Sequence, residues 1–316
     1  MTIPIPGFDV NLIALDKYRT VQAAMKTGFP CPRTYLYEDM DDVRKIVEKE
    51  GFPLVVKPRF TSGGHGMAIV NDFDDLVERL DFDTGNAYRP MIQEYIPGGK
   101  KESLQFVVDR EGNLAFVFHK KRLRTFRVTA RFGTVSRSAG LPPYYRESAK
   151  LMTSFGWWGG GGLEVLIDPR DGSYKLMEIN SRYPRQLWNR TELDINEPLM
   201  CLQIADGHTF TETEDYPKDV LFVNPVEDVM LLCLQLLDAV AYRFRNRASG
   251  SKGFDRSIAP RPMREILKSF ASTYRRGQTR VLDPYTRHFF QDPLVSLSWW
   301  LEFSTWMAGG LKKIGR

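Results

Sequence analysis

The sequence predicts an α+β fold followed by a mainly helical C-terminal extension. Short runs rich in β-branched and aromatic residues alternate with amphipathic segments of helical spacing over the first part of the chain. Several neighbouring runs are separated by tight turns that contain Gly, which is typical of antiparallel hairpins. After residue 211, long apolar segments of helical spacing predominate and predict the extension.

The order of the expected elements is that of a mixed domain. A first amphipathic helix is expected from Asp16, with Val21, Ala24 and Met25 on one face, and it ends at Gly28. Further helices are expected at residues 39–50, 74–80, 147–155, 225–243 and 263–274. Strands are expected at residues 32–36, 51–57, 67–70, 91–96, 103–109 and 114–122.

Length and composition are those of an ordinary globular protein. The 316 residues can bury a substantial core in two or three subdomains, and 42% of them are hydrophobic and 26% charged. Cys31, Cys201 and Cys233 are far apart and lack metal-ligand spacing, so we expect free thiols in a reducing compartment. The first ten residues lack a basic start and a long apolar run, so we expect no secretory signal and a cytoplasmic location.

A predicted β-hairpin around the turn Pro169–Gly172 gathers acidic residues on one face. If the loop has three residues, Glu164 stands opposite Glu178, and period-two alternation puts Asn180 on the same face. A loop of four residues would shift the register by one and separate the two acids. The opposite face carries the apolar side chains expected in the core, namely Leu163, Val165, Met177 and Ile179.

Two readings of this acidic face stay open. Like charges directly opposite on a sheet are destabilising, and a divalent cation would remove the repulsion. Two carboxylates and an amide are oxygen ligands that suit Mg²⁺ held partly by substrate phosphates. The other reading is a solvated acidic strand face without a metal.

A Gly-rich loop over residues 58–66 follows the buried strand that ends at Lys57. Its backbone N–H groups could close over phosphate oxygens, with the lysine as a point charge beneath. The order of residues is not that of a P-loop, and the loop precedes a strand rather than a helix. An ordinary mobile hairpin loop fits the same pattern.

Three further positions could contact a nucleotide or an anion. The strand over residues 91–96 ends at Pro97-Gly98-Gly99, where exposed backbone groups could bind an adenine edge. Glu102, a few residues later, could accept hydrogen bonds from ribose hydroxyls. Arg122 shares a strand face with Arg124, and its bidentate guanidinium makes it a candidate for holding an anion, although a charge run is more often a solvated face.

Four motifs, in this order and spacing, resemble the ATP-grasp family. They are Asp16-Lys17 at a helix start, Phe52–Pro58 with its Gly-rich loop, Gln93–Gly98, and Glu164 together with Glu178–Arg182. The sequence looks closest to the carboxylate-amine ligases and the carbamoyl-phosphate-synthase-like members. The resemblance covers roughly Asp16 to Gly207 and implies two α+β lobes that sandwich ATP.

The resemblance also implies a domain division and a reaction. Residues 1–91 would form the N-terminal lobe with a Gly-rich flap, residues 92–212 the C-terminal lobe with the metal-binding hairpin, and residues 213–316 a basic helical extension. The implied activity is a Mg-ATP-dependent ligase that activates a small-molecule or peptide carboxylate as an acyl-phosphate and joins it to an amine. The alternative is a nucleotide-binding or regulatory module without independent ligase activity.

Site residues follow from the same resemblance, position by position. Those implied to bind ATP are Lys17 and Lys57 at the phosphates, Gly63, Gly64 and Gly66 in the flap, Glu94, Tyr95 and Ile96 at the adenine, and Glu102 at the ribose. Those implied to bind Mg²⁺, with Mn²⁺ as a substitute, are Glu164, Glu178 and Asn180. Arg182 would face the acyl-phosphate, with Arg122 behind it. No Ser/His/Asp or Cys/His nucleophile is evident, and this chemistry needs none.

The chain departs from the family pattern at its N-terminal side. Relatives usually carry a further domain before the first lysine helix, whereas fifteen residues precede Asp16 here. Because that domain often completes the acceptor site, the resemblance leaves the carboxylate and the amine open.

The C-terminal part carries the basic excess of the chain. Residues 240–316 hold fifteen Lys/Arg and five Asp/Glu, so the preceding residues are slightly acidic although the whole chain has a net charge of +5. Residues 293–311 carry Trp299, Trp300, Phe303 and Trp306, with Glu302 as their one charge, and basic residues follow. We favour packing of this segment against its own domain or a second subunit over peripheral contact with a membrane surface. No nucleic-acid partner is expected, because no recognition module accompanies the basic residues.

Overall fold

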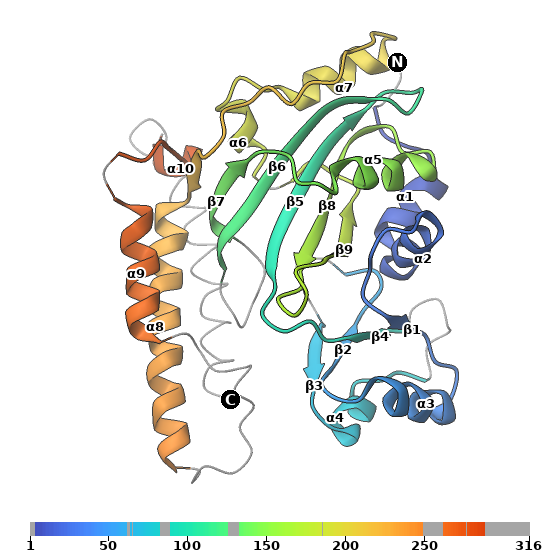
Figure 1. Ribbon diagram of the computed structural model, residues 1–316, viewed down its shortest axis with the longest axis vertical. Coiled ribbons are helices and arrows are strands. Elements are labelled where there is room, and N and C mark those ends of the chain that lie inside the picture. The colour runs from blue at the N-terminus through green and yellow to red at the C-terminus, as the bar shows by residue number, and fades with distance from the viewer. Residues whose placement is uncertain are drawn as a thin grey trace. The chain divides into compact units, whose positions relative to one another are not determined.

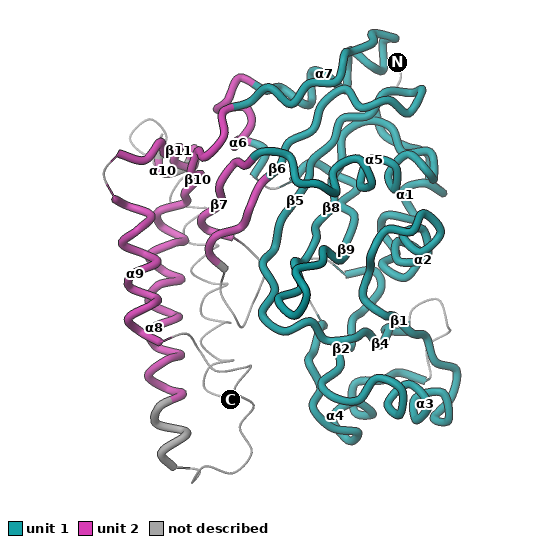
Figure 2. The backbone as a smooth tube through the Cα atoms, in the orientation of Figure 1, with its two compact units in different colours: residues 1–119, 140–187, 195–216 teal, residues 120–139, 188–194, 217–316 magenta. Residues whose placement is uncertain are grey.

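The computed structural model describes residues 4–61, 64, 66–82, 89–125, 133–184, 186–248, 262–275 and 277–287. The chain forms two compact units, coloured separately in Figure 2. The first holds Met1–His119, Gly140–Leu187 and Ile195–Tyr216, and the second holds the remaining segments. Gly63 and the Trp-rich segment at 293–311 lie outside the described residues. The predicted division at residues 91/92 and 212/213 stays a prediction.

A small antiparallel sheet forms one part of the first unit. Its strands are β1 (Thr34–Tyr35), β2 (Leu54–Lys57), β3 (Ala68–Val70) and β4 (Met91–Glu94), in the order β1-β4-β2-β3. Helices α3 (Met40–Glu50) and α4 (Phe73–Glu78) lie beside this sheet (Figure 1). Val43 and Ile46 of α3 and Leu76 of α4 pack with the strands in one apolar cluster. Both helices begin at aspartate caps, which is why the sequence signals located them well.

The other sheet of the first unit carries most of the candidate site. It is part of a seven-stranded sheet and contains β5 (Lys100–Val108), β6 (Leu114–Thr125) up to His119, β8 (Gly159–Ile167) and β9 (Tyr174–Asn180), in the order β6-β5-β8-β9. The helices of this part are α1 (Phe8–Leu15), α2 (Lys17–Thr27), α5 (Tyr145–Ser154) and α7 (Glu197–Ala205). α2 contacts β9 and α5 contacts β5, and their apolar side chains share one core with Leu163, Val165 and Ile179.

The second unit combines three strands with the predicted helices of the extension. Its strands are β7 (Gly133–Ala139), β10 (Leu221–Val223) and β11 (Arg280–Leu282), which continue the seven-stranded sheet from the end of β6 in the order β11-β10-β7-β6. Its helices are α6 (Trp188–Thr191), α8 (Pro225–Ala248), α9 (Met263–Thr273) and α10 (Pro284–Arg287). Fully buried Asp228 accepts hydrogen bonds from Arg124, from Thr134 at 2.8 Å and from Tyr274 at 3.1 Å, which joins β6, β7 and the end of α9.

Two sequence expectations concern thiols and membranes. The three cysteines are free, as predicted. Among the described residues, no helix is both long and apolar enough to cross a membrane.

Candidate nucleotide and metal site

The central hairpin brings Glu164 opposite Glu178, as predicted, but by a different route. The N–H of Asp168 donates to the carbonyl of Ser173 at 2.7 Å, so the loop has four residues and the strands start one residue out of the expected register. A β-bulge then absorbs one extra residue of β9 next to Val165 and restores the pairing of the two acids.

Met177 is the extra residue of this bulge. Contrary to the prediction, its side chain does not join the core. Val165 pairs with Leu176, and Leu176 takes the core position instead. The ammonium of Lys57, at the end of β2, donates to the Met177 carbonyl at 3.0 Å. The bulge therefore also provides a hydrogen-bond acceptor for Lys57, which is predicted to bind phosphate.

Lys17 begins α2, next to its capping residue Asp16. Its ammonium donates to the carbonyl of Thr61 and, at 3.4 Å, to that of Arg59. The Arg59 guanidinium in turn donates to Asp16 at 2.9 Å. These contacts tie the start of α2 to the segment that enters the Gly-rich loop.

Both lysines are buried, with 7% of each exposed, and both respond to the same carboxylate. Burial lowers the pKa of Lys57 to about 8, while the charge of Glu178 opposes that shift. Burial also lowers the pKa of Lys17, again against the opposing charge of Glu178. Glu178 therefore lies within electrostatic reach of both ammonium groups, and three predicted site residues converge.

The predicted metal ligands fit Mg²⁺ bound jointly with a nucleotide. Glu164, Glu178 and Asn180 are all half-buried, and Asn180 pairs with Gly162 on the strand beside Glu164. The described residues contain no group of three or more His, Cys, Asp or Glu side chains that could hold a metal by themselves. Two carboxylates and an amide leave coordination positions for phosphate oxygens, which is how Mg²⁺ is commonly bound.

Glu94, the last residue of β4, lies in a buried ionic network. Its carboxylate is 2.6 Å from the guanidinium of Arg33 and 2.6 Å from the ammonium of Lys175 on β9. Lys175 also lies 3.3 Å from fully buried Asp168, which pairs with Arg170. The network joins the small sheet to the central hairpin. The sequence pattern does not identify Lys175, because its partner lies 81 residues earlier.

Tyr95 and Ile96 follow directly after this network, and Tyr95 is half-buried whereas Ile96 is 7% exposed. The backbone N–H of Glu94 donates to the Arg33 carbonyl at 2.9 Å. That N–H is therefore used within the protein, so an adenine edge at this position would depend on the backbone of the next two residues.

Glu102 is buried in β5 and pairs with core residue Val165, whereas Glu164 pairs with Ser103. Successive residues of a strand point to opposite faces, so Glu102 and Glu164 lie on opposite faces of the sheet. One carboxylate oxygen accepts the Tyr144 hydroxyl at 2.6 Å and lies 3.0 Å from Nε2 of His119. Sequence reasoning did not select these two residues, which lie 42 and 17 positions away. The available signal was a histidine within the apolar run of β6.

Two glycines of the Gly-rich loop, Gly64 and Gly66, are among the described residues, and both adopt backbone conformations that favour glycine. Gly64 and Gly66 both have φ of +71°, a region that other residues adopt at a cost. A Cβ on Gly66 would also stand 2.8 Å from the Pro58 side chain. These features fit a tight turn at the described glycines, Gly64 and Gly66.

The two candidate arginines lie in different units. Arg182 follows β9, is exposed, and donates to the Tyr183 carbonyl at 3.3 Å. Arg122 is half-buried in the second unit. Its action behind Arg182 stays a prediction.

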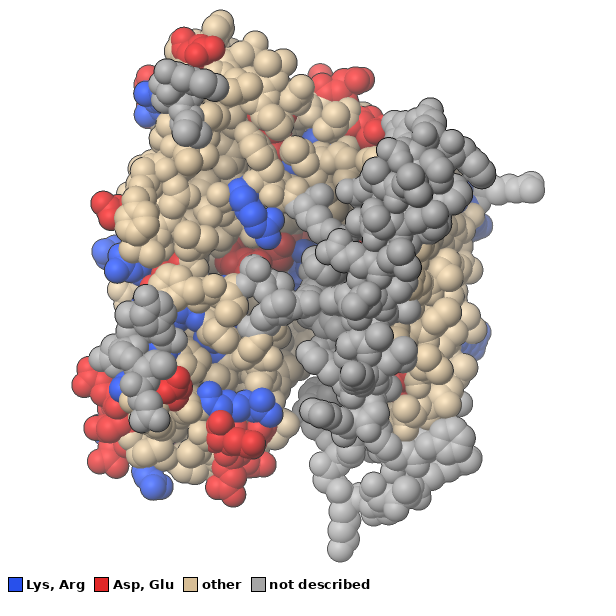
Figure 3. Space-filling model, turned by 180° about the vertical axis from the view of Figure 1, so that it is seen from behind, with Lys and Arg blue, Asp and Glu red and all other residues tan. Residues whose placement is uncertain are grey.

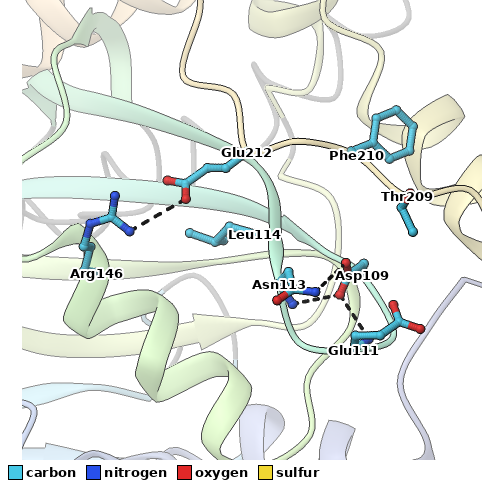
Figure 4. A pocket seen from close by; sticks show the side chains of 8 residues that line it. All are labelled: Asp109, Glu111, Asn113, Leu114, Arg146, Thr209, Phe210 and Glu212. Atoms are coloured by element: carbon cyan, nitrogen blue, oxygen red, sulfur yellow. Dashed lines mark hydrogen bonds and ion pairs between the residues drawn. The ribbon is translucent and has the colours of Figure 1, made fainter.

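Acidic and basic side chains meet in a recess of the first unit when it is seen from behind (Figure 3). A separate pocket of about 410 Å³ contains none of the predicted site residues (Figure 4). Asp109 in its wall accepts hydrogen bonds from the backbone of Glu111 and Asn113, and Arg146 lies 3.7 Å from Glu212. The polar groups of that pocket therefore largely bind one another.

The fold is that of an ATP-grasp protein, as the sequence predicted. The biotin carboxylase domain of Hydrogenobacter thermophilus 2-oxoglutarate carboxylase, solved as a dimer with MgADP, ADP and bicarbonate, matches with a TM-score of 0.59 at 20% identity. The match covers 70% of this chain and 52% of that one. Biotin carboxylase from Campylobacter jejuni, solved in a β-γ-ATP complex, matches with a TM-score of 0.59 at 17% identity over 69% of this chain and 52% of that one.

The chain belongs to the family of the carbamoyl-phosphate synthase L chain ATP-binding domain, whose family model matches residues 16–211. The carbamoyl phosphate synthase large chain of Methanobrevibacter smithii is 24% identical over 51% of this chain and 16% of its own length. That of Vibrio cholerae is 27% identical over 54% of this chain and 17% of its own length. The chain thus spans only a small part of these relatives.

Proposed function

We propose that the protein is an ATP- and Mg²⁺-dependent ligase that activates a carboxylate as an acyl-phosphate and joins it to an amine. The observation that carries this proposal is the contact of buried Lys57 with the Met177 carbonyl, next to Glu178, which stands opposite Glu164. Positive and negative side chains held together in this way suit a nucleotide phosphate bridged to a cation. The family and the fold support the same class of reaction.

In the proposed nucleotide complex, Lys57 exchanges its Met177 carbonyl for phosphate oxygens, and Lys17 contacts the phosphates from the start of α2. By the resemblance, Gly63, Gly64 and Gly66 would cover them and Glu94 to Ile96 would bind the adenine. The ribose role of Glu102 rests on the resemblance alone, because its side chain lies on the face of the sheet opposite Glu164. Glu164, Glu178 and Asn180 hold Mg²⁺, or Mn²⁺ in its place. Bound there, the metal would neutralise charge on the nucleotide phosphates.

The chemical steps need little covalent participation by the protein. A bound carboxylate attacks the γ-phosphorus, the bond to the leaving ADP oxygen breaks, and an acyl-phosphate forms. An amine then attacks the activated carbonyl and releases phosphate. Arg182 would stabilise the negative charge that develops on the carbonyl oxygen, and the resemblance implies a supporting role for Arg122.

Several properties of the whole protein belong to the same proposal. Bicarbonate is a candidate carboxylate, because a similar domain binds it. A homodimer or a partner contact would use the Trp-rich segment at 293–311, with a membrane surface as the less favoured contact and no nucleic acid. Free cysteines agree with a cytoplasmic location.

The test is phosphate release from Mg-ATP with pools of carboxylates, bicarbonate included, and pools of amines. We expect release that requires one member of each pool and that is lost in Glu178→Gln. Binding of Mg-ATP without release from any pool would favour the alternative, a regulatory nucleotide-binding module. Absence of Mg-ATP binding would contradict both.

A further inference from the structure

Gln105 is a buried residue on the face of the sheet that carries the predicted metal ligands. It is 4% exposed, and it lies on β5 opposite Gly162 of β8. Gly162 pairs in turn with Asn180 of β9, and Glu164 lies two residues further along β8. Residues paired directly across antiparallel strands share one face of the sheet, so Gln105 and Asn180 both lie on the face of Glu164.

The glycine between these two side chains leaves room for the Gln105 amide. A Cβ on Gly162 would stand 2.6 Å from Nε2 and 2.7 Å from Cδ of Gln105, so the amide group lies directly above Gly162. The side chain therefore crosses from β5 toward β9. Neighbouring strands lie about 4.8 Å apart, so β5 and β9 are separated by roughly 10 Å. A glutamine and an asparagine that point toward each other can span this distance when the residue between them has no side chain.

One end of the Gln105 amide has no partner. Its Oε1 atom is buried and accepts no hydrogen bond from the described part of the chain. A buried polar atom without a partner costs free energy, so such atoms are rare unless a bound ligand or a rearrangement on binding completes them. The two ends of an amide are alike in shape, so a turn of this group brings its oxygen toward Asn180 without a change in packing. An unused acceptor is therefore held beside a candidate metal ligand.

An asparagine that binds a metal does so through its amide oxygen, which leaves its NH₂ group in need of an acceptor. We propose that Gln105 is a positioning residue for the metal site: its amide oxygen accepts a hydrogen bond from the Asn180 NH₂ group and so holds the Asn180 oxygen toward Mg²⁺. The proposal rests on the metal site proposed above, and Gln105 itself contacts neither metal nor nucleotide. Outer partners of this kind fix the orientation of metal ligands. Gln105 should therefore support binding of Mg²⁺ rather than binding of the nucleotide alone.

Calorimetry of a non-hydrolysable ATP analogue, with Mg²⁺ and with EDTA, tests the proposal. The ratio of the two dissociation constants measures how strongly the metal supports nucleotide binding. We expect Gln105→Leu to lower this ratio by about tenfold, because loss of an outer partner typically weakens metal binding by at least that much. Binding of the analogue in EDTA should be unchanged.

Three further variants show whether the effect passes through Asn180. Gln105→Glu keeps an acceptor at the same position and should keep the wild-type ratio or exceed it. Asn180→Leu should lower the ratio at least as much as Gln105→Leu, and the double variant should lower it no further, because the two residues act as one unit. Gln22→Leu, at an exposed position of α2, is the control and should leave the ratio unchanged.

Melting temperatures without metal separate positioning from a structural role. Leucine removes an unpaired buried amide, so metal-free Gln105→Leu should be at least as stable as the wild-type protein. A glutamine with a merely structural role would instead lower the melting temperature on substitution, and it would weaken binding of the analogue with and without Mg²⁺. A Gln105→Leu protein that is unfolded or less stable would therefore contradict the proposal.

Side-chain amide ¹H–¹⁵N NMR observes the proposed hydrogen bond directly. The Asn180 NH₂ signals are assigned by their loss in Asn180→Leu. When Mg²⁺ and the analogue are added, one of these protons should move downfield in the wild-type protein and should not do so in Gln105→Leu.

The outcomes distinguish this inference from the proposed function. A wild-type ratio in Gln105→Leu, together with a lost ratio in Glu178→Gln, would overturn the role of Gln105 and leave the metal site in place. Loss of the ratio in Gln105→Glu would also overturn it, because the amide would then act as a donor to an anion. Absence of any Mg²⁺ effect in the wild-type protein would contradict the proposed function itself.

Discussion

Lys57 and Arg182 lie in different surroundings although both are candidates for binding phosphate oxygens. Lys57 is buried and donates to a backbone carbonyl. Its ammonium is therefore fixed in position before a phosphate binds. Arg182 is exposed at the end of the hairpin, where its guanidinium can move toward charge that develops during the reaction. The two side chains should therefore contribute at different stages.

Exchange of each residue for alanine separates these stages. Lys57→Ala should weaken Mg-ATP binding by about tenfold or more, because it removes a charge-assisted hydrogen bond of roughly 1.5–3 kcal/mol. Arg182→Ala should leave ATP affinity within about twofold and lower turnover by roughly 10²–10³. Calorimetry measures the first and steady-state phosphate release the second. Equal loss of ATP affinity in both variants would contradict the assignment.

The lowered pKa of Lys57, about 8, makes nucleotide binding depend on pH. Below pH 8 the free protein already carries the ammonium that phosphate needs. Above pH 8 the free protein has lost the proton and must take one up on binding, so affinity should fall by up to about tenfold per pH unit. Calorimetry in buffers of different ionisation enthalpy should show this proton uptake at pH 9 in the wild-type protein and a smaller uptake in Lys57→Ala.

The hairpin β8–β9 shows which part of the site the sequence could predict. Alternation and turn signals predicted that Glu164 and Glu178 face each other, and they do. The loop length and the orientation of Met177 could not be predicted, because a bulge is a local departure from the period on which the prediction rests. The loop is one residue longer than predicted, and the bulge adds one residue to β9. The two departures cancel, so Glu164 and Glu178 still lie opposite each other.

The ionic network around Glu94 acts between elements, and Lys175→Met tests it. The change leaves Glu94 and fully buried Asp168 with one cation fewer, so we expect a loss of about 1–3 kcal/mol in the free energy of unfolding. Urea denaturation measures the loss. Lys150 is exposed on α5, and Lys150→Met should change stability by less than about 0.5 kcal/mol. Equal stability of the two variants would show that the remaining arginines suffice.

Elements with local sequence signals could be predicted, whereas contacts between elements distant in the sequence could not. The aspartate caps of α3 and α4 are local signals, and those helices were located to within a few residues. β7 and α1 had no such signal and were not predicted. His119 and Tyr144 meet Glu102 only because β5, β6 and the start of α5 come together in the fold. The sequence supplied the candidate ligands, and the fold supplied the residues that hold them.

For the whole molecule, binding of Mg-ATP should raise the free energy of unfolding and the melting temperature. A ligand that binds only the folded state stabilises it by about 2.7 kcal/mol at one hundred times its Kd. Glu164 and Glu178 stand directly opposite each other, which costs free energy in the absence of a cation. Binding of Mg²⁺ with ATP removes that cost as well, so the melting temperature should rise more with Mg-ATP than with either component alone.

Glu178→Gln should sharply reduce this Mg-ATP-dependent rise in melting temperature. The metal-free variant should stay within about 1 kcal/mol of the wild-type protein, because relief of the repulsion offsets the lost attraction to Lys17 and Lys57. Glu78→Gln, at an exposed position of α4, is the control and should change neither quantity. If Glu178→Gln keeps the full shift, the paired acids are a solvated strand face, and the proposed ligase loses its metal site.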